Sequence, residues 1–314
     1  MDKRDARSEI AFGKQGSGKT FTSSKEIKLY QQKFSRPVLI VDVKAEYTQY
    51  KAIYYNAKEK DMHKRAMGKD GRGLGIASLH LPRIYRVICR HTDGTAMDQN
   101  ENVELMLTIA KYYKNGMLII EEMNSIIRRT VPPKFYSFLT TLRHNGVDVI
   151  FHFQSFGDPH PDIISQCTIF RIHKTNDSLD SISNKRGITP ERYEITRIAE
   201  MAVNEYYMRG ILLESEAQKR YNTTNRDNFP PAVKKEVERC IYYMLYVDFD
   251  YSKILGMNPE DFTKHATNYL YTEQARMIKN MMSLPDTVNG GRLYKTQQEA
   301  VKKKVEDMRM VYIR

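Results

Sequence analysis

The chain has 314 residues, of which 41% are hydrophobic and 28% are charged, so it is long enough for one large domain or a domain with an appendage, and the composition argues against a mainly disordered state. Lysine and arginine total 50 against 38 acidic residues, and the resulting net charge of +12 favours a polyanionic partner. The 3 cysteines lie far apart without metal-ligand spacing, which argues against a disulfide framework or a zinc site and indicates a reducing compartment.

The N-terminal segment is charged and leads directly into a short apolar run, so it lacks the apolar core of a signal peptide. No apolar run approaches the roughly 20 residues that are needed to cross a bilayer. The sequence therefore predicts a soluble, cytoplasmic protein without a membrane partner.

Short apolar runs alternate with helix-like stretches through the first 175 residues. The runs, several of them rich in β-branched residues, are 9–12, 37–43, 86–89, 117–120, 148–153 and 168–172. Short buried strands separated by helices indicate βαβ units and a mainly parallel sheet. After about residue 176 we expect no more strands, and helices are predicted over 192–214, 232–247, 259–282 and 296–310. A polar stretch, 222–228, predicts a boundary between a domain of residues 1–221 and a helical domain of residues 229–314.

The strongest motif directly follows the first apolar run and has the pattern G-x-x-x-x-G-K-[ST] of a phosphate loop. Glycines allow backbone N–H groups to curl around phosphates, and the following helix points its N-terminus at the anion. The motif predicts that Lys19 contacts the β- and γ-phosphates of ATP and that Thr20 binds Mg²⁺. The alternative is a chance glycine-rich turn, which the flanking strand and helix make improbable. The predicted nucleotide-binding residues are Gly13, Gln15, Gly16, Ser17, Gly18, Lys19 and Thr20.

Two carboxylates, Glu121 and Glu122, end the apolar run 117–120. In phosphate-loop enzymes one carboxylate at such a strand end helps to hold Mg²⁺, and a neighbouring one polarises the attacking water. We assign Glu121 to the metal and Glu122 to the water. The alternative is an ordinary strand that runs into an acidic helix start.

A third segment, 142–154, contains a cation before a strand and an amide at the strand's end. Gln154 could lie near the γ-phosphate and report hydrolysis, and Arg143 could reach the nucleotide of a neighbouring subunit and stabilise charge in the transition state. From the residues alone these roles and structural ones are about equally supported, since an arginine near a helix end also complements the helix dipole. His144, His152 and His160 are not at metal-ligand spacing on one element, and we interpret them as structural.

Together these segments resemble the FtsK/HerA superfamily of DNA-pumping ATPases, which includes viral genome-packaging motors. Asp42, Lys44 and Glu46 resemble the end of that family's second strand, and Arg143 followed by Gln154 is similar to its arginine-then-glutamine segment. The resemblance covers roughly residues 8–186. Two positions of the second-strand motif depart from the family, because Val43 and Ala45 stand where a proline and a glycine are usual.

The resemblance implies an α/β P-loop NTPase fold of the RecA/ASCE type, with a mainly parallel sheet and here a helical C-terminal appendage. It also implies ATP and Mg²⁺ as cofactors, a homo-oligomeric ring, pentameric or hexameric, and double-stranded DNA as the polymer that is moved. A small chain without membrane or sequence-reading parts best fits a viral packaging ATPase, which would act in the host cytoplasm and bind a capsid portal. A HerA-like helicase or a plasmid-transfer motor is the alternative within this class, and a nucleotide switch or kinase that never moves DNA is the alternative outside it.

A basic segment, 51–90, interrupts the rhythm of strands and helices. It holds ten basic residues against three acidic ones, a local net charge of +7. We interpret it as the candidate DNA contact, made to phosphates more than to bases. A solvated charged face is an equally good reading.

Overall fold

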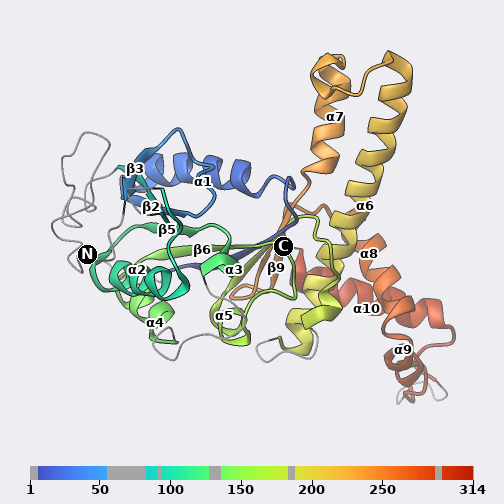
Figure 1. Cartoon of the computed structure of the whole chain (residues 1–314). Coiled ribbons are helices and arrows are strands. Elements are labelled where there is room, and N and C mark those ends of the chain that lie inside the picture. Colours follow the sequence, from blue (N-terminus) through green and yellow to red (C-terminus); the bar gives the residue numbers. More distant parts are fainter. Residues whose placement is uncertain are drawn as a thin grey trace. The chain divides into compact units, whose positions relative to one another are not determined.

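The computed structural model describes residues 6–54, 83–90, 94–126, 136–182, 188–286 and 292–313 (Figure 1). The chain forms two compact units. The first unit consists of Met1–Ile169 with Thr175–Ile188, and the second consists of Phe170–Lys174 with Thr189–Arg314.

The first unit alternates strands with helices, as the apolar runs predict. Its elements in chain order are β1 (Ser8–Phe12), α1 (Lys19–Phe34), β2 (Val38–Asp42), β3 (Lys51–Tyr54), β4 (Ile84–Ile88), α2 (Gln99–Tyr112), β5 (Met117–Ile120), α3 (Met123–Ile126), α4 (Tyr136–His144), β6 (Asp148–Phe153), α5 (Pro161–Gln166) and the 3₁₀ helix η4 (Leu179–Ile182). The strands lie in the order β3-β4-β2-β5-β6-β1. All of these pairs are parallel, which confirms the predicted mainly parallel α/β fold.

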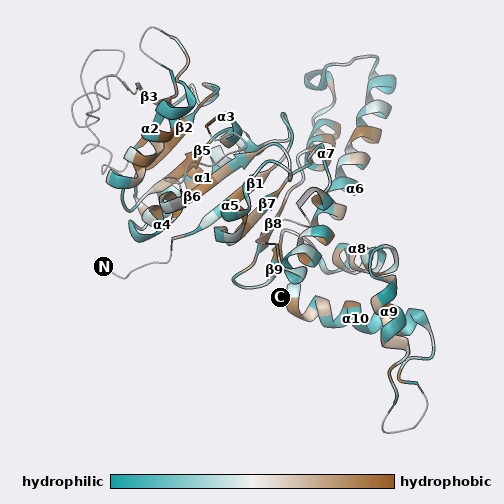
Figure 2. Ribbon diagram, turned by 60° about the horizontal axis from the view of Figure 1, so that its bottom comes forward, coloured by the Kyte–Doolittle hydropathy of each residue, from teal (hydrophilic) through white to brown (hydrophobic). Residues whose placement is uncertain are grey.

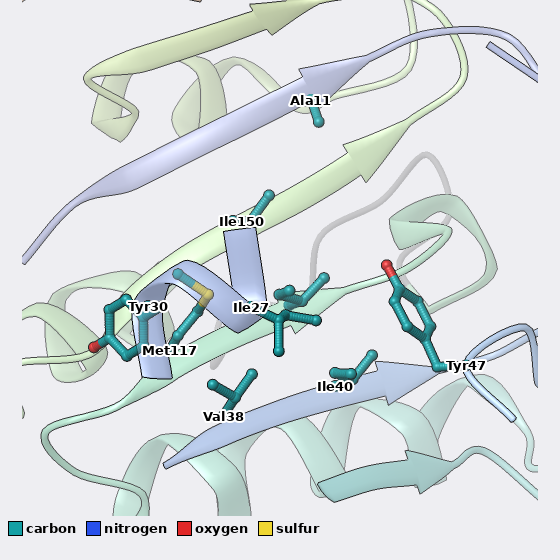
Figure 3. Close-up of a cluster of buried hydrophobic side chains, with 9 residues drawn as sticks. Ala11, Ile27, Tyr30, Val38, Ile40, Tyr47, Met117 and Ile150 are labelled. Carbon is teal, nitrogen blue, oxygen red and sulfur yellow. The ribbon is translucent and has the colours of Figure 1, made fainter. Parts of the chain in front are cut away.

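The core of this unit lies where α1 covers the sheet. Alternate residues of a strand share a face, so Val38 and Ile40 of β2 point to the same side. They meet Ile27 and Tyr30 of α1, which are three residues apart on one helix face. The cluster, most of which is labelled in Figure 3, consists of Ala11, Ile27, Tyr30, Val38, Ile40, Tyr47, Met117, Ile119 and Ile150. Figure 2 shows the same feature as hydrophobic colouring along the strands. Each large side chain buried here contributes about 1.5–3 kcal/mol.

The strand order brings the predicted functional segments to one edge of the sheet. Strand β6 lies between β1, which precedes the phosphate loop, and β5, which precedes the two carboxylates. The backbone N–H of Gly13 donates to the carbonyl of Phe153 at 3.1 Å, and that of Glu121 donates to Val41 at 3.0 Å. Since parallel strands end at the same edge, the loop, the carboxylates and Gln154 emerge together.

One strand of the first unit was not predicted. Strand β3 consists of Lys51, Ala52, Ile53 and Tyr54 and lies at the end of the strand order, beside β4. A strand of four residues that begins with lysine is too short to show a clear hydrophobic period. The pattern of this basic region therefore does not predict it.

The second unit combines helices with a β-hairpin. Its elements are β7 (Ile169–Ile172, whose first residue belongs to the first unit), α6 (Pro190–Tyr221), η5 (Arg226–Asn228, a 3₁₀ helix), α7 (Pro231–Ile241), β8 (Leu245–Asp248), β9 (Lys253–Leu255), α8 (Pro259–Thr272), α9 (Ala275–Met282) and α10 (Gln297–Tyr312). Strands β8 and β9 pair antiparallel.

The hairpin corrects the expectation that strands end near residue 176 and that one helix runs over 232–247. Helix α7 ends at Ile241, and β8 follows with burial that alternates along the strand, the pattern of period two. The turn is fixed by Asp248, whose Oδ1 accepts from the N–H groups of Asp250 at 3.1 Å and Tyr251 at 3.2 Å. Ser252 completes the turn with φ at 50°. The helix predicted over 259–282 is likewise divided, into α8 and α9.

The two compact units have different boundaries from the predicted domains, 1–221 and 229–314. Whether those domains fold independently stays a prediction. Helix α6 belongs to the second unit. It packs so closely on α7 that a Cβ atom on Gly210 would lie 2.7 Å from Cγ1 of Ile241. In the polar stretch, Arg226 Nη2 donates back to Glu214 of α6 at 2.8 Å. Among the helices described, none is both long and apolar enough to cross a membrane.

Candidate nucleotide-binding site

The phosphate loop joins β1 to α1 through two residues in the left-handed region. Gly16 has φ at 76° and Gly18 has φ at 91°, and this conformation costs residues with a Cβ atom about 1–2 kcal/mol. Gly18 also occupies the N-cap of α1 and makes no side-chain capping bond there. The first N–H groups of α1 therefore lack the usual cap and can donate to an anion, which is the geometry that the motif predicts.

Lys19 is held inside the loop. Its Nζ donates to the carbonyl of Gly13 and, at 3.2 Å, to that of Lys14. Burial lowers the pKa of Lys19 below its ordinary value, and the nearby charges of Glu121 and Glu122 oppose that effect. The ammonium and the two carboxylates therefore share one electrostatic environment.

Glu121 is almost fully buried at the end of β5. Its Oε1 accepts from the hydroxyl of Tyr47 at 2.6 Å and lies 2.9 Å from Nδ1 of His152. Burial by itself raises the pKa of Glu121, but His152, Tyr47 and the charge of Lys19 lower it to about 2. Because this pKa is depressed from 4.5 in the unfolded chain, the ionised carboxylate stabilises the fold above about pH 4.5, and that contribution is lost as the pH falls towards 2.

Glu122 is held by two partners at the same edge of the sheet. Its Oε1 and Oε2 accept from Nε2 of Gln154 at 2.6 and 2.8 Å. Its Oε2 also forms an ion pair with Nζ of Lys44 at 2.6 Å. The backbone of Glu122 has φ at 51°, a strained conformation of the kind that persists where surrounding contacts enforce it. The predicted water-activating residue and Gln154 are thus in direct contact.

The turn after β2 delivers the partners of this site. Asp42 is fully buried, and its two oxygens accept from the N–H groups of Glu46 at 2.9 Å and Tyr47 at 3.1 Å. Arg86 of β4 forms an ion pair with Asp42 at 3.1 Å. Ala45 lies in this turn with φ at 58°. At this position the FtsK/HerA superfamily, which the segment resembles, usually has glycine. The left-handed conformation that glycine favours is therefore kept, although the residue is alanine.

The sequence analysis assigns Thr20 and Glu121 to Mg²⁺, but the carboxylate that Thr20 contacts in the structure is a different one. Its Oγ1 donates to Oε2 of Glu46 at 3.0 Å. In the described parts of the chain, no group of three histidine, cysteine, aspartate or glutamate residues could hold a metal by itself. A pair of ligands, Glu121 and Thr20, nevertheless fits Mg²⁺, because this cation takes one or two protein ligands and completes its shell with phosphate oxygens and water. The ionised Glu121 and the hydroxyl of Thr20 are the residues that would hold it.

Arg143 lies at the opposite edge of the sheet from its own phosphate loop. It is in the last turn of α4, shortly before the amino end of β6, whereas Gly13 contacts the carboxyl end of that strand at Phe153. A strand of this length spans about 17 Å. Nη2 of Arg143 donates to the carbonyl of Gln166 at 3.0 Å. This placement separates Arg143 from the other predicted site residues, and its role in a neighbouring subunit stays a prediction.

Sequence reasoning missed several residues of this site. Lys44 and Glu46 were recognised only as part of a family motif, and Tyr47 and His152 received no functional role. The signal available was the motif Asp42–Tyr47 itself, because Asp42 accepts from the backbone N–H groups of Glu46 and Tyr47 and so holds this turn. The contact between His152 and Glu121 had no signal in the sequence, since it joins residues of two different strands. Of the basic segment 51–90, residues 55–82 lie outside the described residues.

Three comparisons relate this chain to known proteins. No family model matches it, and a search of curated proteins gave no match. Similar solved structures include the genome packaging NTPase B204 from Sulfolobus turreted icosahedral virus 2 in complex with ATP-gammaS, with 16% sequence identity, a TM-score of 0.44, and coverage of 81% of this chain and 96% of that one. B204, the DNA-packaging ATPase from Sulfolobus turreted icosahedral virus, has 16% identity and a TM-score of 0.43, with 80% and 97% covered.

A further solved structure is the N-terminal domain of zonular occludens toxin from Neisseria meningitidis. It has 14% identity and a TM-score of 0.31, and the match covers 55% of this chain and 79% of that chain. The roles of individual residues in this chain therefore follow from its own geometry.

Proposed function

We propose that this chain is an ATPase whose site is formed by the phosphate loop 13–20 and the carboxylates after β5. The observation that carries the proposal is the juxtaposition at one sheet edge of Lys19, Glu121 and Glu122, with Gln154 donating to Glu122 at 2.6 Å. A loop alone would bind phosphate. A carboxylate held by an amide beside that loop also supplies what hydrolysis needs, a group that can orient and polarise water.

In this mechanism the chain binds and orients the nucleotide before it acts on water. The N–H groups at the start of α1 and the ammonium of Lys19 hold the phosphates and balance the charge that develops on them. When bound through Thr20 and Glu121, Mg²⁺ would neutralise charge on the β- and γ-phosphates. Glu122 accepts a proton from the attacking water, and Gln154 fixes the orientation of Glu122.

We further propose that hydrolysis drives translocation of double-stranded DNA, in a motor of the viral genome-packaging type. Support comes from the resemblance of residues 8–186 to DNA-pumping ATPases and from the net charge of +12. A ring of identical subunits, a DNA contact through the basic segment 51–90 and docking on a capsid portal belong to this proposal. A net positive charge supports this proposal because it attracts a polyanion such as DNA over a long range.

The test is an ATPase assay of the purified chain with and without double-stranded DNA, together with a mass measurement of the assembled particle. We expect hydrolysis that DNA stimulates and a mass equal to five or six subunits. Hydrolysis that ignores DNA, from a monomer, would instead support a nucleotide switch or a kinase. Stimulation in the presence of a nuclease partner, without binding to a portal, would support the HerA-like helicase.

The predicted trans role of Arg143 gives the ring its own test. Arg143 lies at the sheet edge remote from its own loop. Arg143→Ala should therefore lose hydrolysis but still bind ATP. Its defect should be smaller than that of Lys19→Ala. Mixing this variant with Lys19→Ala should restore part of the activity, because some interfaces then combine an intact loop with an intact arginine. Two inactive variants that stay inactive in verified mixed rings would exclude a trans role.

A further inference from the structure

A buried histidine connects the helix after the phosphate loop to the carboxylate that we assign to the metal. His152 lies in β6, and its side chain is 1% exposed. It shares a strand face with Ile150, since alternate residues of a strand point to the same side. Ile150 packs in the core cluster with Ile27 of α1, as Figure 3 shows, so His152 belongs to the face that α1 covers.

Both ring nitrogens of His152 meet polar partners. Nε2 lies 2.8 Å from Oγ of Ser23, which is fully buried in α1, and Nδ1 lies 2.9 Å from Oε1 of Glu121. Ser23 is one helical turn after Lys19, on the same face of α1. A buried polar chain thus runs from the phosphate-loop helix to the end of β5. Burying polar groups among apolar neighbours is costly unless they meet polar partners, and His152 has such a partner on each side, Ser23 at Nε2 and Glu121 at Nδ1.

The two contacts on Glu121 restrain one of its oxygens. Tyr47 and His152 both approach Oε1, and in the described structure neither of them uses Oε2. A carboxylate whose one oxygen is fixed from two sides keeps a single orientation, and its second oxygen remains for a cation. Residues that orient a metal ligand in this way commonly change metal affinity about 10–100-fold when they are replaced.

We propose that His152 is a positioning residue, which holds Oε1 of Glu121 against the phosphate-loop helix through Ser23 so that Oε2 is presented to the Mg²⁺ of a bound nucleotide. In this arrangement Nε2 and the hydroxyl of Ser23 share a hydrogen bond, and Nδ1 lies against Oε1 of Glu121. The inference rests on the proposed ATPase function, and it adds a physical link between the phosphate loop and the metal carboxylate.

A matched pair of amide variants tests the link. The amide of His152→Asn can occupy the position of Nδ1 and donate to Glu121, whereas that of His152→Gln extends towards Ser23 and leaves Glu121. The measurement is the affinity for a fluorescent ATP analogue, once with Mg²⁺ and once with EDTA. The ratio of the affinity in Mg²⁺ to the affinity in EDTA should be about tenfold smaller in His152→Gln than in the wild type. In His152→Asn this ratio should fall about threefold at most. Both variants should bind the analogue normally in EDTA.

Two further variants complete the experiment. Ser23→Ala removes the outer contact with little change in volume, and it should weaken the Mg²⁺ effect about threefold. His144→Gln changes an exposed histidine of α4 and should behave as the wild type. Circular dichroism verifies that each variant is folded.

The outcomes separate this inference from the function on which it rests. Equal behaviour of the Asn and Gln variants would overturn the positioning role, as would an unchanged Mg²⁺ dependence in Ser23→Ala. Loss of binding in EDTA to the same extent as in Mg²⁺ would show a purely structural role and would also overturn it. If the wild type itself binds no ATP in either buffer, the proposed ATPase function fails instead.

Discussion

Replacing Lys19 by alanine is expected to abolish ATP hydrolysis while the fold stays intact. The ammonium of Lys19 is held among the loop carbonyls by its bonds to Gly13 and Lys14, and it shares the electrostatic environment of Glu121 and Glu122. Its removal leaves the charge on the transferred phosphoryl group without its main protein counter-charge. Loss of a donor at such a position costs about 10²–10³ in turnover, which would bring a motor of modest rate to background. Phosphate release by the purified variant measures this effect.

The fold should tolerate this change. Burial lowers the pKa of Lys19, so its charged form is less stable in the folded chain than in water, and alanine removes that cost. The thermal unfolding midpoint should therefore not fall. Lys28→Ala is the matched control, because Lys28 is exposed on the same helix. Turnover of Lys19→Ala at the level of Lys28→Ala would refute the assignment of the loop.

The first unit could be predicted from sequence because its signals are local. The strands β5 and β6 coincide with the apolar runs 117–120 and 148–153, and the glycine pattern at 13–20 fixes where β1 ends and α1 begins. Each of these signals depends on neighbours in the chain. The edge to which the carboxylates and Gln154 come then follows from the parallel arrangement alone.

The contacts within the site could not be predicted in the same way. The bond from Tyr47 to Glu121 joins residues 74 positions apart, and that between Ser23 and His152 joins residues 129 positions apart. Such pairs depend on strand order and on which face each side chain takes. A histidine on an apolar strand looks the same in sequence whether it fills a core or orients a carboxylate. Only the position of α1 over β6 distinguishes the two.

The second unit shows a different limit. The segment after Ile241 is rich in tyrosine, and tyrosine spacing there is compatible with a helix, so the hairpin of β8 and β9 was missed. Its turn depends on Asp248 and on Ser252 in the left-handed region. A turn that uses a serine in place of glycine or asparagine gives a weak sequence signal, and tertiary packing decides the structure.

Glu122→Gln is expected to reduce ATP hydrolysis about 10²–10⁴-fold and to leave ATP binding intact. The substitution keeps the shape of the side chain but removes the carboxylate that would accept a proton from water, and general-base catalysis typically contributes that factor. The ion pair with Lys44 is lost, but Lys44 is partly exposed, so the stability cost is about 0.2–1 kcal/mol. Single-turnover hydrolysis and equilibrium binding of ATP separate the two effects. Glu104→Gln, an exposed acid on α2, is the control and should hydrolyse ATP normally.

The same assay divides the roles of the two carboxylates. Glu121 is buried, has a pKa of about 2 and contacts Tyr47 and His152, so it carries a fixed negative charge suited to a cation. Glu122 is held by Gln154 and by a lysine at the surface, so it is the one placed to meet water. Glu121→Gln should therefore raise the Mg²⁺ concentration needed for half-maximal hydrolysis, whereas Glu122→Gln should lower turnover at every Mg²⁺ concentration. The reverse pattern would exchange the two assignments, because a metal ligand and a general base cannot produce each other's dependence on Mg²⁺.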